Sequence, residues 1–143
     1  MRILIINGPN LNVLGKREPQ LYGTATLWDI ENSLKEKFPA FKLEFYQSNI
    51  EGEIVNYVQQ GMNGTVDGIV INPGAYAHYS YAIRDAIAML KIPVVEVHLT
   101  NIHAREGFRK HSVTAEVCRG VIAGFGAHGY ELAMSALVKL LKQ

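Results

Sequence analysis

The stretch MRILIINGPN at residues 1–10 decides the fold. Residues 3–6 are four consecutive aliphatic side chains, so a strand formed here would be apolar on both faces. Such strands belong to parallel sheets that are covered by helices on either side. An asparagine, a glycine and a proline then end the run, as is usual where a strand passes into a turn. The stretch therefore predicts a buried parallel strand.

Four further short apolar runs predict strands at residues 43–46, 68–71, 94–97 and 120–123. Amphipathic stretches at helical spacing lie between the runs, and the first has Thr26 placed to cap it, with Asp29 three residues on. The apolar stripes are Leu27, Ile30, Leu34 and Phe38; Ile50, Ile54, Tyr57 and Val58; Ile83, Ile87 and Leu90; and Leu132, Ala136, Leu137 and Leu140. Strand and helix thus alternate about five times, which predicts a doubly wound α/β fold.

The composition narrows the class of protein. A chain of 143 residues with 48% hydrophobic content fits one domain with a real core. A net charge of +1 gives no field to attract nucleic acid or anionic lipid. The one cysteine, Cys118, is expected in the core and fits a reducing compartment. No apolar run suits a signal sequence or a membrane span, so we expect a cytoplasmic protein.

Ligands of such sheets bind beyond the carboxyl ends of the strands, where this chain is rich in polar residues. Turns are polar anyway, which explains Asn7 and Gly8 but not Glu96 and His98, because these two lie inside an apolar run. Two residues apart on a strand, they share one face, and a carboxylate beside an imidazole suits a general acid or base. The alternative is a buried ion pair, and the position at a strand end favours catalysis.

The connection between the first strand and the first amphipathic helix is unusually long. Residues 7–23 make seventeen residues, whereas such connections usually take ~2–6 and longer ones tend to be lids. Arg17 and Tyr22 lie in it. A free phenol ionises near pH ~10, and one neighbouring cation typically lowers a pKa by ~1–3, so a single arginine is marginal and a second cation would help. Tyr22 is either a base or a surface aromatic, and spacing does not decide between them.

Other polar residues have open interpretations. Arg105 and Arg109 are four apart in a segment, 101–111, that we expect to be helical; one could bind hydroxyls or a carboxylate, and Arg105 is interpreted as a solvated helix residue. Asn10, Asn12 and Asn72 could donate to a developing oxyanion, although Asn12 fits a turn equally well.

Two other classes of function compete with catalysis by these groups. GFGAHG at 124–129 fits the dinucleotide pattern and suggests a flavin- or nucleotide-binding module, but only fourteen residues follow it, too few for the rest of that fold. His98 and His103 suggest a metal-dependent hydrolase, but no third spaced ligand is evident. Neither pattern is complete.

Four motifs occur in order: INGPNLN at 6–12, REP with the later YG at 17–23, NPGAYAH at 72–78 and EVHLTNIHAR at 96–105. Together they make the chain resemble the type II 3-dehydroquinate dehydratases over nearly its whole length. Ala77 and Gly107 depart from the usual threonine and glutamate, and neither position carries the family's chemistry.

The resemblance implies a flavodoxin-like, five-stranded, three-layer α/β/α fold, with residues 1–143 as one catalytic domain. It implies trans-elimination of water from 3-dehydroquinate to 3-dehydroshikimate through an enolate, without metal or cofactor. By analogy, Tyr22, ionised with help from Arg17, removes the proton alpha to the ketone. Asn10 holds a water that stabilises the enolate, and His98, oriented by Glu96, protonates the departing hydroxyl.

The resemblance also assigns residues that bind the substrate. Asn72 and the backbone of Leu99 and Thr100 would hold the carboxylate, while His78 and Arg109 would bind ring hydroxyls. Because the family forms trimers that assemble into dodecamers, Asp85 is expected to reach the site of a neighbouring subunit.

Overall fold

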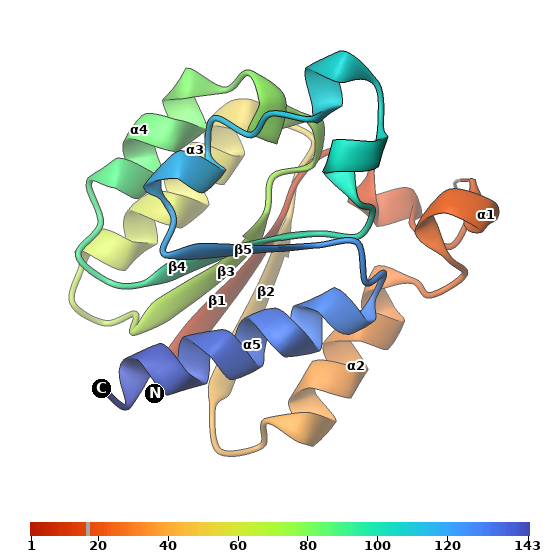
Figure 1. Ribbon diagram of the computed structural model, residues 1–143. Coiled ribbons are helices and arrows are strands. Elements are labelled where there is room, and N and C mark those ends of the chain that lie inside the picture. The colour runs from red at the N-terminus through yellow and green to blue at the C-terminus, as the bar shows by residue number, and fades with distance from the viewer. Residues whose placement is uncertain (17) are drawn as a thin grey trace.

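The computed structural model describes residues 1–16 and 18–143. One sheet holds five parallel strands in the order β2-β1-β3-β4-β5, with two of the longer helices on each face (Figure 1). The strands are β1 Arg2–Asn7, β2 Lys42–Gln47, β3 Gly68–Asn72, β4 Val94–His98 and β5 Gly120–Ala123. The α-helices are α1 Pro19–Tyr22, α2 Leu27–Lys37, α3 Glu51–Gln59, α4 Tyr81–Ala88 and α5 His128–Leu141. This confirms the predicted flavodoxin-like, three-layer α/β/α fold.

The side chains of β1 show why the sheet is covered on both faces. Ile3 and Ile5 join the core under α2 and α5, while Leu4 and Ile6 join the core under α3 and α4, and all four are fully buried. This alternation is the one that a strand with apolar residues on both faces requires. The edge strand β5 differs, because Val121 is 49% exposed.

The helix predictions were right in position, but two of the predicted apolar stripes are only partly right. Ile50 precedes α3 and is 59% exposed. The capping box of α2 is confirmed: the Thr26 hydroxyl accepts from the Asp29 N–H, and the Asp29 carboxylate accepts from the Thr26 N–H. In α5 the expected stripe is right at Leu137 and at the partly buried Leu140, and wrong at Leu132 and Ala136. Apolar residues lie nearly all round this helix, so contact with the sheet rather than spacing selects the buried face. That face consists of Tyr130, Ala133, Met134 and Leu137.

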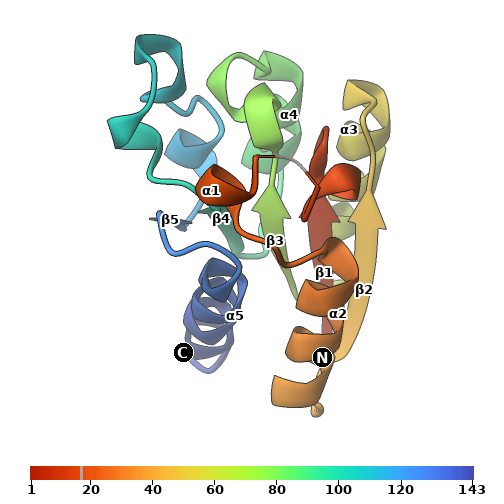
Figure 2. The ribbon, with the colours of Figure 1, turned by 90° about the vertical axis from the view of Figure 1, so that its right-hand side faces the viewer.

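Short helical turns form in two segments for which the sequence predicted something else: a long connection at residues 7–23 and one helix at residues 101–111. The long connection after β1 contains a 3₁₀ turn, Leu11–Val13, and the helix α1, which lies near the carboxyl ends of the strands (Figure 2). The expected helix over 101–111 is wrong: two 3₁₀ turns, Ile102–Ala104 and Gly107–Arg109, occupy this segment. The remaining 3₁₀ turns are Gln60–Met62, Gly74–His78 and Ala115–Val117.

Candidate active site

A pocket opens at the carboxyl ends of β1, β3 and β4, beside the point where the strand order reverses. Ligands of doubly wound sheets bind at this point. Most of the predicted site residues meet here. The pocket is lined by Asn10, Tyr22, Asn72, His78, His98, Leu99, Thr100, Arg105 and Arg109, with Pro9, Leu11, Gly74, Ala75 and Ile102.

Three predicted residues that the structure describes, Glu96, Asn12 and Asp85, do not line the pocket. Glu96 lies behind His98 and is fully buried. Asn12 is exposed beside the pocket, and the structure favours its interpretation as a turn residue. Asp85 is exposed on α4 and does not reach the pocket of its own chain. The prediction for Arg17 lies outside the described residues.

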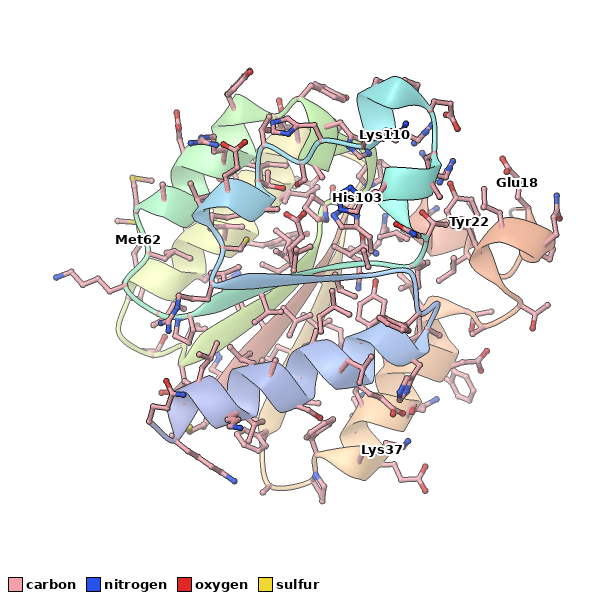
Figure 3. The ribbon with its side chains drawn as sticks, in the orientation of Figure 1. Glu18, Tyr22, Lys37, Met62, His103 and Lys110 are labelled. Atoms are coloured by element: carbon pink, nitrogen blue, oxygen red, sulfur yellow. The ribbon has the colours of Figure 1, made fainter. Side chains whose placement is uncertain are left out.

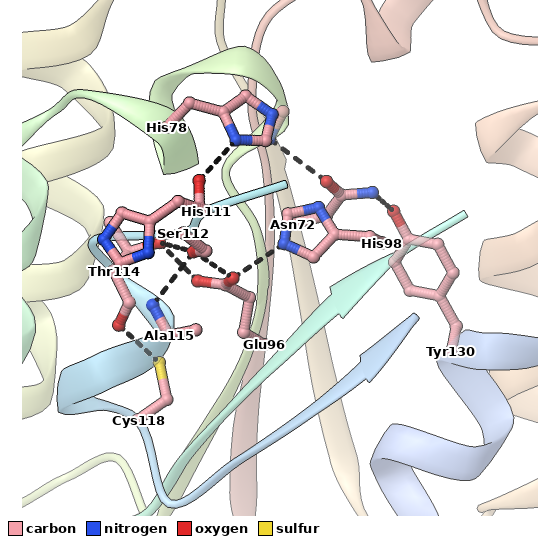
Figure 4. Close-up of polar contacts among 11 residues, drawn as sticks. Asn72, His78, Glu96, His98, His111, Ser112, Thr114, Ala115, Cys118 and Tyr130 are labelled. Atoms are coloured by element: carbon pink, nitrogen blue, oxygen red, sulfur yellow. Dashed lines mark hydrogen bonds and ion pairs between the residues drawn. The ribbon is translucent and has the colours of Figure 1, made fainter. Parts of the chain in front are cut away.

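Glu96 receives three hydrogen bonds in the interior (Figure 4). Its Oε2 atom lies 2.7 Å from His98 Nε2 and 2.7 Å from Ser112 Oγ, and its Oε1 atom accepts from the Thr114 hydroxyl. Ser112 Oγ itself accepts from the Ala115 N–H at 3.1 Å. A buried charge is tolerated only where it is paired and hydrogen-bonded, and three donors around one carboxylate meet that requirement.

Glu96 also fixes the tautomer of His98. Because Glu96 accepts at Nε2, this nitrogen carries a proton, and Nδ1 is the nitrogen left for a ligand in the pocket. The imidazole is 5% exposed, so packing holds the ring as well. The arrangement suits transfer of a proton between His98 and a bound molecule.

His78 faces the same pocket from the 3₁₀ turn after β3. Its ring lies 6.4 Å from the His98 ring, and its Nδ1–H donates to the His111 carbonyl oxygen at 2.8 Å. Burial lowers the pKa of His78, against the opposing effect of that hydrogen bond. A neutral ring with Nδ1–H engaged offers Nε2 as an acceptor to a ligand hydroxyl.

Tyr22 ends α1 and lies between this helix and the turns that follow β4 (Figure 3). Its hydroxyl accepts from Arg105 Nη1 at 3.3 Å, and the same nitrogen lies 3.2 Å from Thr100 Oγ1. The interpretation of Arg105 as a solvated helix residue is therefore wrong, since its side chain is only 14% exposed and lines the pocket. Burial opposes the charge of Arg105, but its contacts with Tyr22 and Glu106 raise its pKa overall.

Asn72 ends β3 and lies on the floor of the pocket, 3% exposed. Its Oδ1 accepts from the Gly74 N–H at 3.1 Å and its Nδ2 donates to the Tyr130 hydroxyl at 3.0 Å. Gly8 brings β1 close to it: the Gly8 N–H donates to the Asn72 carbonyl at 2.8 Å, and a Cβ atom on Gly8 would lie 2.4 Å from the Pro73 carbonyl oxygen. Asn10, in the left-handed conformation with φ 69°, then enters the pocket.

Comparison with known proteins assigns this arrangement to a family. The family model for class II dehydroquinases matches residues 1–138. The chain belongs to the class II dehydroquinases. It is 53% identical to the 3-dehydroquinate dehydratase of Wolinella succinogenes, over 100% of this chain and 87% of that protein, and 51% identical to that of Bacillus cereus, over 99% and 98%. The type II dehydroquinase structure from Butyrivibrio crossotus superimposes with a TM-score of 0.92 at 50% identity, covering 96% of this chain and 97% of that one.

Sequence reasoning missed three hydroxyl groups of this dehydroquinase. Ser112 and Thr114 support Glu96 from a segment sixteen and eighteen residues further on, and Tyr130 reaches Asn72 from α5. None belongs to a motif. The only signal was that Ser112 and Thr114 are polar residues two apart around a valine, as Glu96 and His98 are.

Over residues 1–16 and 18–143, no three His, Cys, Asp or Glu side chains gather as a metal site would require. His103 is exposed whereas His98 is buried, so the structure does not favour the alternative in which these two bind a metal. Cys118 packs against the core under α3 and α4 as predicted, and burial raises the pKa of its thiol. In the described part of this dehydroquinase, no helix has the length and apolarity of a membrane span.

Proposed function

We propose that this class II dehydroquinase eliminates water from 3-dehydroquinate to give 3-dehydroshikimate. The observation that carries the proposal is that a phenol contacted by a guanidinium and an imidazole bonded to a carboxylate line the same pocket. Removal of a proton alpha to a carbonyl needs a base, and loss of the neighbouring hydroxyl needs an acid. The names of the relatives supply the substrate, and the described side chains supply both groups.

Tyr22 is the base in this proposal. Its phenolate would take the proton alpha to the ketone, and the electrons of that C–H bond would form the enolate. Arg105, 3.3 Å from the phenol oxygen, stabilises the phenolate by a charge-assisted hydrogen bond. Arg105 is therefore a cation, other than Arg17, that assists ionisation of the phenol. Arg17 keeps its proposed role of assisting Tyr22, although it lies outside the described residues.

His98 is the acid. Its protonated Nδ1 would give a proton to the departing hydroxyl as the enolate expels it and the carbon–carbon double bond forms. Glu96 stabilises the positive ring through Nε2 and holds its plane. Asn10 holds a water against the enolate oxygen, in keeping with its place at the rim of the pocket.

The remaining lining residues bind the substrate. Asn72 and the backbone N–H groups of Leu99 and Thr100 would hold its carboxylate, since amide N–H groups are the donors that an anion requires. His78 and Arg109 would bind ring hydroxyls. The neutral ring of His78 suits such a partner.

The proposal includes the setting of the reaction. All of residues 1–143 form one catalytic domain of a cytoplasmic enzyme that needs no metal or cofactor. The chain assembles as trimers within a dodecamer, and Asp85 reaches the site of a neighbouring subunit. Its exposure on α4 supports this role.

The test is a turnover assay on chelator-treated protein. 3-Dehydroquinate should give an enone that absorbs in the ultraviolet, and a flat absorbance trace would refute the proposed reaction. Tyr22→Phe should lower kcat by about 10²- to 10⁴-fold with little change in KM, as loss of a general base does. The matched control is Tyr79→Phe, a phenol that is 58% exposed and does not line the pocket.

A further inference from the structure

Tyr130 connects the last helix to the ends of two strands. It lies in the first turn of α5 and is fully buried, with its ring in the core under α2 and α5. Its hydroxyl lies 2.5 Å from Asn7 Oδ1, at the end of β1, and 3.0 Å from Asn72 Nδ2, at the end of β3. Figure 4 shows the phenol meeting the amide of Asn72 from the side of α5.

The direction of each hydrogen bond follows from counting protons. Burial raises the pKa of Tyr130, so the phenol keeps its one proton at neutral pH. The amide oxygen of Asn7 can only accept, so it takes that proton, and the phenol oxygen must then accept from Asn72. A flipped Asn72 amide would turn Oδ1 toward the phenol oxygen and Nδ2 toward the Gly74 N–H, which costs both hydrogen bonds.

We propose that Tyr130 is a positioning residue, which, anchored by Asn7, holds the Asn72 amide so that the second N–H of Nδ2 serves the substrate carboxylate. The inference rests on the proposed function, because it takes Asn72 as a ligand of that carboxylate. One N–H of Nδ2 is used by Tyr130, and Asn72 lines the pocket. Without Tyr130, the Gly74 N–H would be the one contact of this pair still holding the amide, and a rotated amide would present Oδ1 to the anion and repel it.

The experiment compares two ligands in Tyr130→Phe. The product 3-dehydroshikimate carries the carboxylate, and its carboxamide analogue has the same shape without the charge. Loss of one hydrogen bond to a charged partner predicts that Kd for the product, and KM for 3-dehydroquinate, rise about 10- to 150-fold. Kd for the carboxamide should change less than about twofold, because a carboxamide has both a donor and an acceptor and can pair with either orientation of the Asn72 amide. We also expect kcat to change little.

A double-mutant cycle shows whether Tyr130 acts through Asn72. In the Asn72→Ala background, Tyr130→Phe should have no further effect on Kd for the product. Equal weakening of both ligands, or the full effect of Tyr130→Phe in that background, would overturn the inference. Tyr57→Phe, which removes a phenol on α3 remote from the pocket, is the matched control and should leave both Kd values unchanged.

A second measurement covers the case in which Tyr130→Phe fails to fold. In the wild-type protein, the two Nδ2 protons of Asn72 should differ in exchange with solvent, with the one bonded to Tyr130 protected. Equal, fast exchange of both protons would overturn the inference. A wild-type protein that leaves 3-dehydroquinate unchanged would instead refute the proposed function, so the two failures are distinguishable.

Discussion

Replacing Thr114 by valine tests whether the hydroxyls around Glu96 hold the proposed catalytic pair, Glu96 and His98, together. Valine keeps the shape of threonine and puts a methyl group in place of the hydroxyl that donates to Glu96 Oε1 and lies 3.1 Å from Ser112 Oγ. Both residues are fully buried, so no solvent replaces the lost donor. Hydrogen bonds to charged groups contribute about 1.5–3 kcal/mol, and we expect the free energy of unfolding to fall by about 2–3 kcal/mol.

The expected change in Tm follows from the length of the chain. Unfolding entropies of ~2.1 cal/mol/K per residue give about 300 cal/mol/K for 143 residues, so 2–3 kcal/mol corresponds to roughly 7–10 °C. The fall in stability should be followed by far-UV circular dichroism in urea, because Trp28 is 70% exposed and its fluorescence would report unfolding poorly. Protein concentration must be held fixed, since any oligomerisation shifts the apparent stability.

Thr114→Ser is the matched control for this prediction. It keeps the hydroxyl and loses a methyl group, which costs about 1 kcal/mol. We expect kcat to fall about tenfold in Thr114→Val, because Glu96 is less firmly held behind His98, and to stay near the wild-type value in Thr114→Ser. If the serine variant loses as much kcat as the valine variant, the hydroxyl does not support catalysis and the reasoning is wrong.

Three further outcomes follow from single contacts. Arg105→Met should lower kcat about 10- to 100-fold by removing a charge-assisted hydrogen bond to the phenol, and added guanidinium should restore part of the rate; an unchanged kcat would contradict the role of Arg105. The pKa of His78 is lowered in the fold, so the unfolded chain binds more protons than the folded one as the pH falls through ~6.5. The free energy of unfolding of the wild type should therefore fall relative to that of His78→Gln as the pH drops from 7.5 to 5. Urea titrations that show the opposite slope would refute this prediction. Gly8→Ala, with a Cβ atom 2.4 Å from the Pro73 carbonyl oxygen, should destabilise by about 3 kcal/mol in urea, whereas Gly52→Ala, with open space around it, should not destabilise.

The sequence predicted well what depends on local pattern. The run at residues 3–6 gave β1 and its two buried faces, and Thr26 with Asp29 gave the start of α2. Ligands of doubly wound sheets bind beyond the carboxyl ends of the strands, and these ends share one edge of the sheet. This correctly predicted that His98 and Asn72 lie in one pocket.

The predictions failed where tertiary contacts choose among equivalent local options. The face of α5 could not be read because the helix is apolar nearly all round, and packing on the sheet selects Tyr130 rather than Leu132. Arg105 looks solvated at helical spacing, but 3₁₀ turns redirect it onto Tyr22, a residue 83 positions away. Such long-range contacts leave no periodic signal in one sequence.

The two buried networks of the site have the same chemical logic on different walls of the pocket. In each network a residue that faces the pocket donates to a buried partner that can only accept from it. His98 donates to Glu96 on β4, and Asn72 donates to Tyr130 beside β3. Thr114, which donates to Glu96, and Tyr130, which accepts from Asn72 and donates to Asn7, both come from segments after β4. The C-terminal third of the chain therefore does more than cover the sheet, because it sets which proton each pocket group presents before a ligand arrives, and a site prepared in this way needs little reorganisation when charge develops.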